Sequence, residues 1–194
     1  MAKLTRYGYK RKKGKGPLMP EVFIISDTHF GHNNIVKFNR SDGSPLRPWD
    51  NVDQMDDALI KNWNRVVGKE DKVYHLGDVT MNSKSLDLLY NLNGTKILIK
   101  GNHDIQALKY YTPHFKDIRG SHELDGFLMT HIPVHDSQKG RYRANIHGHI
   151  HAGKIKDPWY YNVSVEAIDY TPINFNEIQR HYKNTAKPVK GKRS

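Results

Sequence analysis

The sequence predicts a single α/β domain in which helices cover both faces of a sheet. Short apolar runs rich in β-branched residues alternate along the chain with amphipathic segments, which is the pattern of strand, helix, strand. Each run ends on a polar residue, as expected where ligands bind at the carboxyl ends of strands. The 194 residues suffice for one domain with its own core and leave no room for a second catalytic domain.

Five apolar runs are predicted strands. The first, residues 21–26, is almost continuously apolar, which indicates a strand buried on both faces, and Asp27 follows it. The others are 72–77 before Asp78, 95–100 before Gly101 and Asn102, 126–130 before His131, and 144–147 before Gly148 and His149. A less regular alternation predicts a further strand within 160–168.

Three segments are predicted helices. Apolar residues recur every three or four positions between 52 and 67, with Trp63 as a core anchor and Asp56 and Asp57 on the solvent side. A second helix is predicted over 84–91. The third, 174–183, follows Pro172 and has Asn174 as its cap.

The positive charge lies at the two ends of the chain. Of the 31 basic residues, seven lie in 1–20 and five in 183–194, and neither segment contains an acid. The central residues 21–182 then hold nineteen basic residues against all twenty acids, so the predicted domain is close to neutral. We expect a basic N-terminal arm, 1–20, and a basic C-terminal tail, 183–194. These are either solvated extensions or arms that attract nucleic acid.

Composition limits the cellular setting and the metal chemistry. There is no cysteine, which excludes disulfides, thiolate ligands and a cysteine nucleophile. The sequence has neither a long apolar run nor the apolar block of a signal peptide, so we expect a cytoplasmic protein without a membrane partner. Its oligomeric state does not follow from the sequence.

Motifs with metal-ligating side chains follow the predicted strands. In chain order they are Asp27-Thr28-His29, Gly77-Asp78, Gly101-Asn102-His103-Asp104 and Gly148-His149-Ile150-His151. Each is weak alone, but their ordered combination is rare by chance. Together they offer the oxygen and nitrogen ligands that two adjacent divalent ions require, which predicts a hydrolase.

The types of residue suggest separate roles within such a site. Asp78, alone after Gly77 at a strand tip, is the best candidate for a bridging carboxylate, because glycine allows a sharp turn there. Asp27 and His29 offer a carboxylate and an imidazole to one ion. His149 and His151 project to the same side of an extended segment, which suits either one ion or two neighbouring ions.

The remaining motif combines a ligand with a proton donor. Asn102 offers its amide oxygen to a metal. We expect His103 to protonate the leaving oxygen, and Asp104 to fix the tautomer of His103 and keep its imidazolium charged. Manganese is the expected ion, although iron, zinc and nickel suit the same ligands.

With these motifs in this order, and with His131 after the fourth strand, the chain resembles the calcineurin-like metallophosphoesterases, particularly their short bacterial and phage members. The resemblance covers about Val22 to Ile178. It implies a four-layer α/β/β/α sandwich, in which two mixed sheets pack face to face with helices outside. The ligand sets that it implies are Asp27, His29 and His151 for the first metal, Asn102, His131 and His149 for the second, Asp78 as the bridge, and His103 with Asp104 as the acid dyad.

One departure from the family pattern bears on the substrate. Protein phosphatases of the family place an acid and an arginine shortly after the Gly-Asp pair, where this chain has Val79-Thr80-Met81-Asn82. The missing arginine argues against a phosphoprotein. We therefore expect hydrolysis of phosphomonoesters or phosphodiesters, with a small phosphoester or nucleotide as substrate and a hydroxide activated between the metals as nucleophile. The alternatives are a metal-dependent nuclease whose basic tails hold DNA or RNA, and a non-catalytic scaffold with a vestigial metal site.

Other histidines are assigned by position. His32 and Asn33 lie at a predicted helix start, where backbone donors favour phosphate, so they either bind substrate or cap that helix. His75 and His147 lie inside strands, directly before the ligand positions. A histidine there more often orients a ligand than binds the metal itself.

Overall fold

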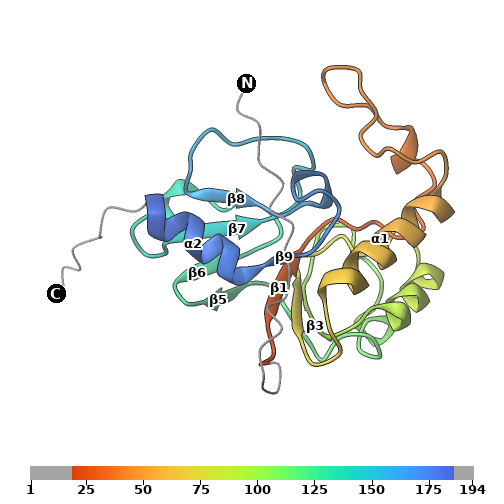
Figure 1. The fold of residues 1–194 in the computed structure, drawn as a ribbon, viewed down its shortest axis with the longest axis horizontal. Coiled ribbons are helices and arrows are strands. Elements are labelled where there is room, and N and C mark those ends of the chain that lie inside the picture. Colours follow the sequence, from red (N-terminus) through yellow and green to blue (C-terminus); the bar gives the residue numbers. More distant parts are fainter. Residues whose placement is uncertain (1–18, 186–194) are drawn as a thin grey trace.

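The computed structural model describes residues 19–185, with side chains to Lys183, and forms two mixed sheets (Figure 1). The first sheet has the order β4-β3-β2-β1-β9 and consists of β1 (Val22–Ile25), β2 (Lys72–His75), β3 (Thr95–Ile99), β4 (Asp117–Arg119) and β9 (Ile173–Asn174). The second has the order β5-β6-β7-β8 and consists of β5 (His122–Leu124), β6 (Phe127–Met129), β7 (Ala144–His147) and β8 (Tyr160–Asn162). The strands β1 to β4 are parallel, as are β6 to β8, whereas β9 and β5 are antiparallel to their neighbours.

Strand β1 contributes to two cores, as its continuous apolar sequence predicts. Phe23 and Ile25 belong to the core that the first sheet shares with helix α1 (Val52–Val66). Ile24, on the opposite face, belongs to the core between the sheets, together with Phe127 and Ile146 of the second sheet. This alternation follows from the two-residue period of a strand. Two sheets, rather than the single sheet of the simplest α/β pattern, confirm the fold that the family resemblance implies.

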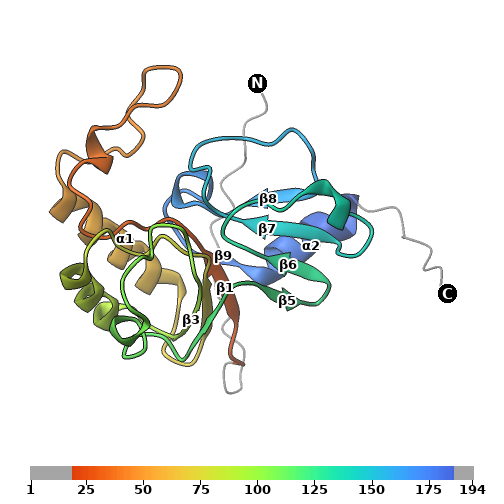
Figure 2. The same ribbon diagram turned by 180° about the vertical axis from the view of Figure 1, so that it is seen from behind.

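The helices pack against these sheets. In α1, the Asn51 side chain accepts a hydrogen bond from Gln54 N at 3.0 Å and caps the helix, whose inner face buries Leu59 and Trp63. Helix α2 (Phe175–Thr185) lies over one face of the second sheet, as Figures 1 and 2 show from opposite sides. The predicted cap Asn174 accepts a hydrogen bond from Asn176 N at 2.9 Å.

Several expectations need correction. The segment predicted as a helix over 84–91 is a 3-10 helix, η2 (Ser83–Asn91). The strand predicted within 160–168 ends at Asn162, because the chain turns there into η5 (Val165–Ala167). Three further 3-10 turns are η1 (Ile35–Lys37), η3 (Leu108–Tyr110) and η4 (Asp136–Gln138). Asp56 is buried rather than solvent-facing, whereas Asp57 is exposed as predicted.

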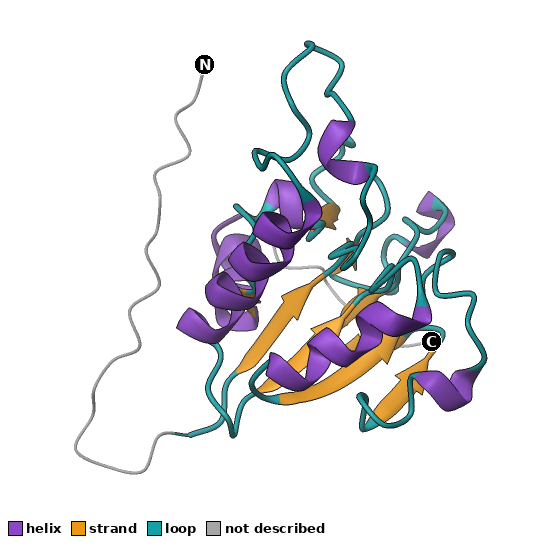
Figure 3. Cartoon of the chain, turned by 90° about the vertical axis from the view of Figure 1, so that its right-hand side faces the viewer, coloured by secondary structure: helices purple, strands orange, loops and turns teal. Residues whose placement is uncertain are grey.

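The parallel strands carry their following loops toward one end of the molecule (Figure 3). Residues 1–18 of the predicted N-terminal arm and 186–194 of the predicted tail lie outside the described residues. Within residues 19–185, no helix is both long and apolar enough to cross a lipid bilayer.

Candidate metal centre

The candidate ligands lie in tight turns directly after strands. Asp27, His29, Asp78, His149 and His151 all have left-handed backbones, with φ values of 60°, 49°, 55°, 70° and 49°. This conformation is unfavourable for residues with a Cβ, by about 1–2 kcal/mol each. Such strain persists where packing enforces it, and it clusters at functional sites. Here it turns five polar side chains toward one another at the ends of β1, β2 and β7.

Two glycines allow these turns to approach each other closely. A Cβ on Gly101 would collide with Asp78, and it would lie 2.5 Å from the Asp78 backbone nitrogen. A Cβ on Gly148 would collide with the Ser26 hydroxyl and the Asp27 carboxylate. The glycines of the two longer motifs therefore make room for the carboxylates of the two shorter ones.

The first group of converging side chains consists of Asp27, His29 and His151. One ligand atom of each lies within 4.8 Å of the others. The His29 and His151 rings are stacked with centroids 5.2 Å apart. Neither ring nitrogen of His29 has a hydrogen-bond partner among the described residues, although both nitrogens are buried. A buried imidazole without a partner is costly, and a bound cation would satisfy it. Burial, with Arg47 nearby, lowers the pKa of His29 well below its usual value, so the ring is neutral, as a ligand must be.

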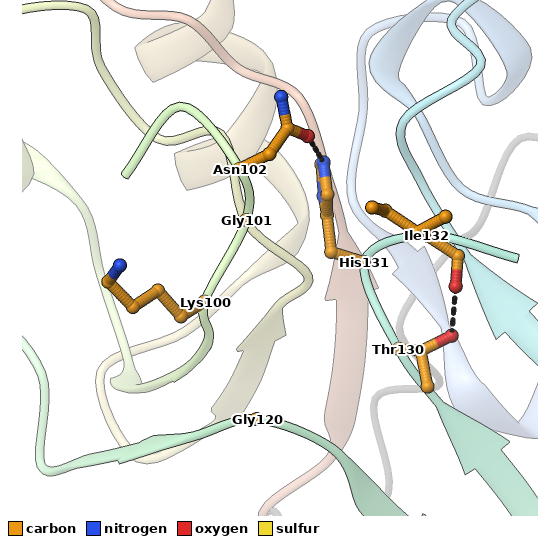
Figure 4. A pocket seen from close by; sticks show the side chains of 7 residues that line it. All are labelled: Lys100, Gly101, Asn102, Gly120, Thr130, His131 and Ile132. Carbon is orange, nitrogen blue, oxygen red and sulfur yellow. Dashed lines mark hydrogen bonds between the residues drawn. The ribbon is translucent and has the colours of Figure 1, made fainter. Parts of the chain in front are cut away.

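The second group consists of Asp78, His131 and His149, whose ligand atoms also lie within 4.8 Å of one another. His131 Nδ1 donates to the Leu76 carbonyl at 2.7 Å, which leaves Nε2 to face the site. This Nε2 is 2.8 Å from Asn102 Oδ1, as Figure 4 shows, and 3.3 Å from Asp78 Oδ2. Burial lowers the pKa of His131, but the hydrogen bond from Nε2 to Asp78 and the nearby carboxylate charges together outweigh burial and raise it. A metal would displace this Nε2 proton, and the three atoms would then all be electron-pair donors. Their convergence fits a cation.

Asp78 lies between the two groups. Its Oδ2 is 3.7 Å from His29 Nε2 and 3.3 Å from His131 Nε2. Burial disfavours the charged carboxylate, but hydrogen bonds from His131 and the His103 backbone, together with the nearby histidines, outweigh this and lower the pKa of Asp78 to about 2. The carboxylate is therefore ionised across the physiological range, and its position suits a bridge.

The structure changes the expectation for Asp104. Its buried carboxylate accepts hydrogen bonds from three backbone amides, those of Asp78 and Val79 at 2.9 Å and Gly101 at 2.8 Å. Within residues 19–185, no hydrogen bond joins it to the His103 imidazole. Asp104 thus fastens the Asp78 turn to the loop after β3 and does not form the predicted dyad. His103 is exposed, its ring centroid 5.7 Å from that of His29, and its backbone N–H donates to Asp78 Oδ1 at 2.8 Å.

The two candidate substrate residues differ in position. The His32 ring lies 5.6 Å from the His29 ring, at the edge of the first group. Asn33 is exposed, and no interaction ties its side chain to the site within the described part of the chain. The element that follows is the three-residue η1 rather than an α-helix, so the expected helix N-terminus for phosphate is missing.

Two histidines lie behind the candidate ligands, as predicted. Buried His75 contacts the Thr28 hydroxyl through Nε2 at 2.9 Å and accepts a hydrogen bond from Gly77 N at 3.2 Å. Burial lowers the pKa of His75 to about 3, so it stays neutral. His147 Nδ1 contacts the Gly148 carbonyl at 2.9 Å. Both rings therefore brace the turns that carry ligands.

Sequence reasoning misses a buried ion pair behind the first group. Glu166 Oε1 accepts from Arg47 Nε at 2.9 Å and lies 3.1 Å from His151 Nδ1. Arg47 also donates to the carbonyl oxygens of Asp27 at 2.6 Å and Thr28 at 2.7 Å. A carboxylate on the far nitrogen of a histidine orients the other nitrogen toward a metal. Arg47 and Glu166 are 119 residues apart, one in an aperiodic loop and the other in a short turn. No local sequence pattern therefore predicts their ion pair.

Comparisons with known proteins agree with this geometry. The family model described as calcineurin-like phosphoesterase superfamily domain matches residues 21–163. An uncharacterized protein of Methanocaldococcus jannaschii is 36% identical over 176 residues, which are 82% of this chain and 90% of that protein. The Gene 66 protein of Mycobacterium phage L5 is 31% identical over 135 residues, which are 67% of this chain and 58% of the phage protein.

A similar solved structure comes from Aquifex aeolicus. It is the crystal structure of a protein of unknown function that is 27% identical to this chain, with a TM-score of 0.66, and the match covers 84% of this chain and 100% of that one. The family model covers most of the chain, and its range contains every candidate ligand. This chain belongs to the calcineurin-like phosphoesterase superfamily.

Proposed function

We propose that this protein is a two-metal phosphoesterase that hydrolyses phosphomonoesters or phosphodiesters. The observation that carries the proposal is the pair of adjacent ligand groups with Asp78 between them. In this assignment the first ion is held by Asp27, His29 and His151, the second by Asn102, His131 and His149, and both by Asp78. Asn102 joins the second set because its amide oxygen faces His131 Nε2 at 2.8 Å.

The ions supply electrophilic chemistry. When bound, two divalent cations lower the pKa of water, and they stabilise the negative charge that develops on the phosphoryl and leaving oxygens. We propose manganese for both positions. Iron, zinc and nickel are compatible with the same nitrogen and oxygen ligands, so metal substitution belongs in the test.

The residues of the chain position the ester and move the proton. We propose that the His103 imidazole gives a proton to the leaving oxygen; its exposed ring beside His29 and its backbone hydrogen bond to Asp78 at 2.8 Å support this role. Asp104 positions His103 indirectly, because it holds both loops through backbone amides. The Arg47 and Glu166 pair keeps His151 oriented.

The proposal is tested by assaying the purified protein with manganese against p-nitrophenyl phosphate and bis-p-nitrophenyl phosphate. We expect turnover that EDTA abolishes and manganese restores, and that Asp78→Asn lowers by about 100-fold or more, since the bridge also orients the reacting groups. Asp57→Asn, on the exposed face of α1, is the matched control and should retain full activity. Absence of turnover with manganese, iron, zinc or nickel in a folded protein would instead support the scaffold alternative.

A further inference from the structure

A cavity of about 340 Å³ lies directly beside the candidate second metal position (Figure 4). Its lining includes Lys100, Asn102, Gly120, Thr130, His131 and Ile132. The first three come from the loops that follow β3 and β4, whereas the others come from the end of β6 and the loop after it. The volume is at the lower end of the range for small-molecule sites, so it suits one sugar or aromatic ring with its substituents.

The polar groups of this cavity are mostly committed to other contacts. The Thr130 hydroxyl donates to the Ile132 carbonyl at 2.7 Å. Asn102 and His131 face each other at the candidate second metal position, at 2.8 Å. The remaining charged group is the exposed Lys100 ammonium, which has no ion pair with any residue of the range 19–185. None of the lining residues is acidic.

Lys100 and Ile132 give the cavity two different walls. Figure 4 shows Lys100 and Ile132 on opposite sides of the Gly101-Asn102 turn and His131, with the Lys100 side chain extending away from Ile132. Ile132 is 51% exposed, which leaves an apolar surface next to His131. A ligand beside the metal position therefore has the apolar Ile132 on one side and the flexible Lys100 side chain on the other, whose ammonium can swing toward it. A cation of this kind binds phosphate or carboxylate through charge-assisted hydrogen bonds.

We propose that this cavity binds the leaving group of the substrate, and that the leaving group carries a second anionic function, a phosphate or a carboxylate, which Lys100 recognises. This inference rests on the proposed function, because it places the scissile phosphate at the neighbouring metal position. Ile132 contacts the carbon framework between the two anions. The substrate is thus a phosphoester whose leaving group carries a second negative charge, separated from the scissile phosphate by one ring or a short spacer.

Binding of uncleavable analogues tests this assignment apart from turnover. Calorimetry of the manganese-loaded protein would compare phenylphosphonate with 4-phosphonobenzoate, which differs by one carboxylate. We expect 4-phosphonobenzoate to bind about tenfold more tightly to the native protein, and Lys100→Met to remove that advantage while Lys100→Arg keeps it. Lys61→Met, on the exposed face of α1, should behave like the native protein. Equal affinities of the native protein for the two phosphonates would overturn the proposal.

Turnover then distinguishes the two possible anions and separates this proposal from the proposed function. Phenyl phosphate, 4-carboxyphenyl phosphate and 1,4-phenylene bisphosphate share one ring and differ in the second anion. We expect Lys100→Met to raise the KM of one or both dianionic esters about tenfold and to leave phenyl phosphate unchanged. An equal loss on all three esters would contradict leaving-group recognition. Hydrolysis of none of them by the native protein would contradict the phosphoesterase proposal, while the phosphonate affinities would still decide the role of Lys100.

Discussion

The imidazole of His151 is oriented by a contact on the side away from the candidate metal. Its Nδ1 lies 3.1 Å from Glu166, and Glu166 is held in turn by Arg47, so the orientation of one ligand depends on a buried charge pair. Both side chains of that pair are inaccessible to solvent. Arg47 also binds the Asp27 and Thr28 carbonyl oxygens, and it thereby links the turn after β1 to the segment that carries Glu166.

Replacement of Arg47 by Met should therefore destabilise the fold. The change leaves Glu166 buried without its cation, and removal of one partner from a buried pair costs about 3–5 kcal/mol of unfolding free energy. Urea unfolding of the metal-free protein measures this loss. Arg65→Met is the control and should change stability little, because the exposed Arg65 guanidinium hydrogen-bonds the Thr171 hydroxyl at 3.2 Å and has no ion pair within residues 19–185. A loss below about 1 kcal/mol for Arg47→Met would mean that the pair does not brace the site.

His103 is tested by varying the leaving group. A general acid contributes about 10²–10⁴-fold when the leaving oxygen needs a proton and less when it does not. We therefore expect His103→Ala to lower kcat for phenyl phosphate much more than for p-nitrophenyl phosphate, whose phenolate leaves unprotonated. His135→Ala, an exposed histidine in the loop after β6, is the control. Equal losses for the two esters would exclude proton donation by His103.

At the scale of elements, the site depends on turns as much as on strands. The residues after β1, β2 and β7 adopt left-handed backbones, and the glycines before Asn102 and His149 leave space for carboxylates of neighbouring turns. The sequence predicts only part of this: the extended segment expected at His149 and His151 is wrong, because both residues have left-handed backbones and they join different ligand groups. The apolar run ending at Asp27 and the Gly-Asp pair both mark a strand followed by a tight turn.

Contacts between elements are less accessible to sequence reasoning. Asp56 looks solvent-facing on a helical projection, yet its carboxylate accepts from Gly31 N at 3.0 Å and is buried where α1 meets the turn after β1. The spacing of α1 predicts the helix but not what packs against its polar side. Asp104 shows the same limit: its motif places it beside His103, whereas the tertiary structure gives its oxygens to three backbone amides.

Gly148→Ala should disturb the site without unfolding the domain. The added methyl group would displace the Asp27 carboxylate and Ser26, and we expect a loss of manganese affinity of about tenfold or more, as for other changes that misorient a ligand. Calorimetric titration with manganese measures this affinity. Gly120→Ala is the matched control, because its Cβ would meet no atom within 4 Å. Unchanged affinity in Gly148→Ala would show that Asp27 tolerates the displacement or is not a ligand.

Asp56 makes the stability of this interface dependent on pH. Burial raises its pKa from 3.8 to about 7, although the Gly31 amide favours the charged form. The unfolded chain releases this proton at lower pH, so the folded protein binds the extra proton between about pH 4 and 7 and loses stability as pH rises through that window. We expect the unfolding free energy of Asp56→Asn, relative to that of the native protein, to be higher at pH 8 than at pH 5. Urea unfolding at the two pH values measures this difference. The difference between Asp57→Asn and the native protein should not change with pH. If the unfolding free energies of Asp56→Asn and the native protein changed equally with pH, the assignment to Asp56 would be refuted.

At the scale of the whole molecule, each ligand group draws on both sheets. Asp27 and His29 follow β1 of the first sheet, whereas His151 follows β7 of the second. Asp78 follows β2 of the first sheet, whereas His131 and His149 follow β6 and β7 of the second. Both candidate metal positions therefore exist only when the sheets are packed together, and metal binding should stabilise the folded chain.

The number of bound metals tests this account most directly. Elemental analysis by mass spectrometry, after loading with manganese and removal of the free ion, would be made on the native protein, Asp78→Asn and the control Asp57→Asn. Two ligand groups joined by one carboxylate predict two ions per chain in the native and control proteins and fewer in Asp78→Asn. One ion or none in the native protein, or two ions retained in Asp78→Asn, would contradict a dinuclear centre bridged by Asp78.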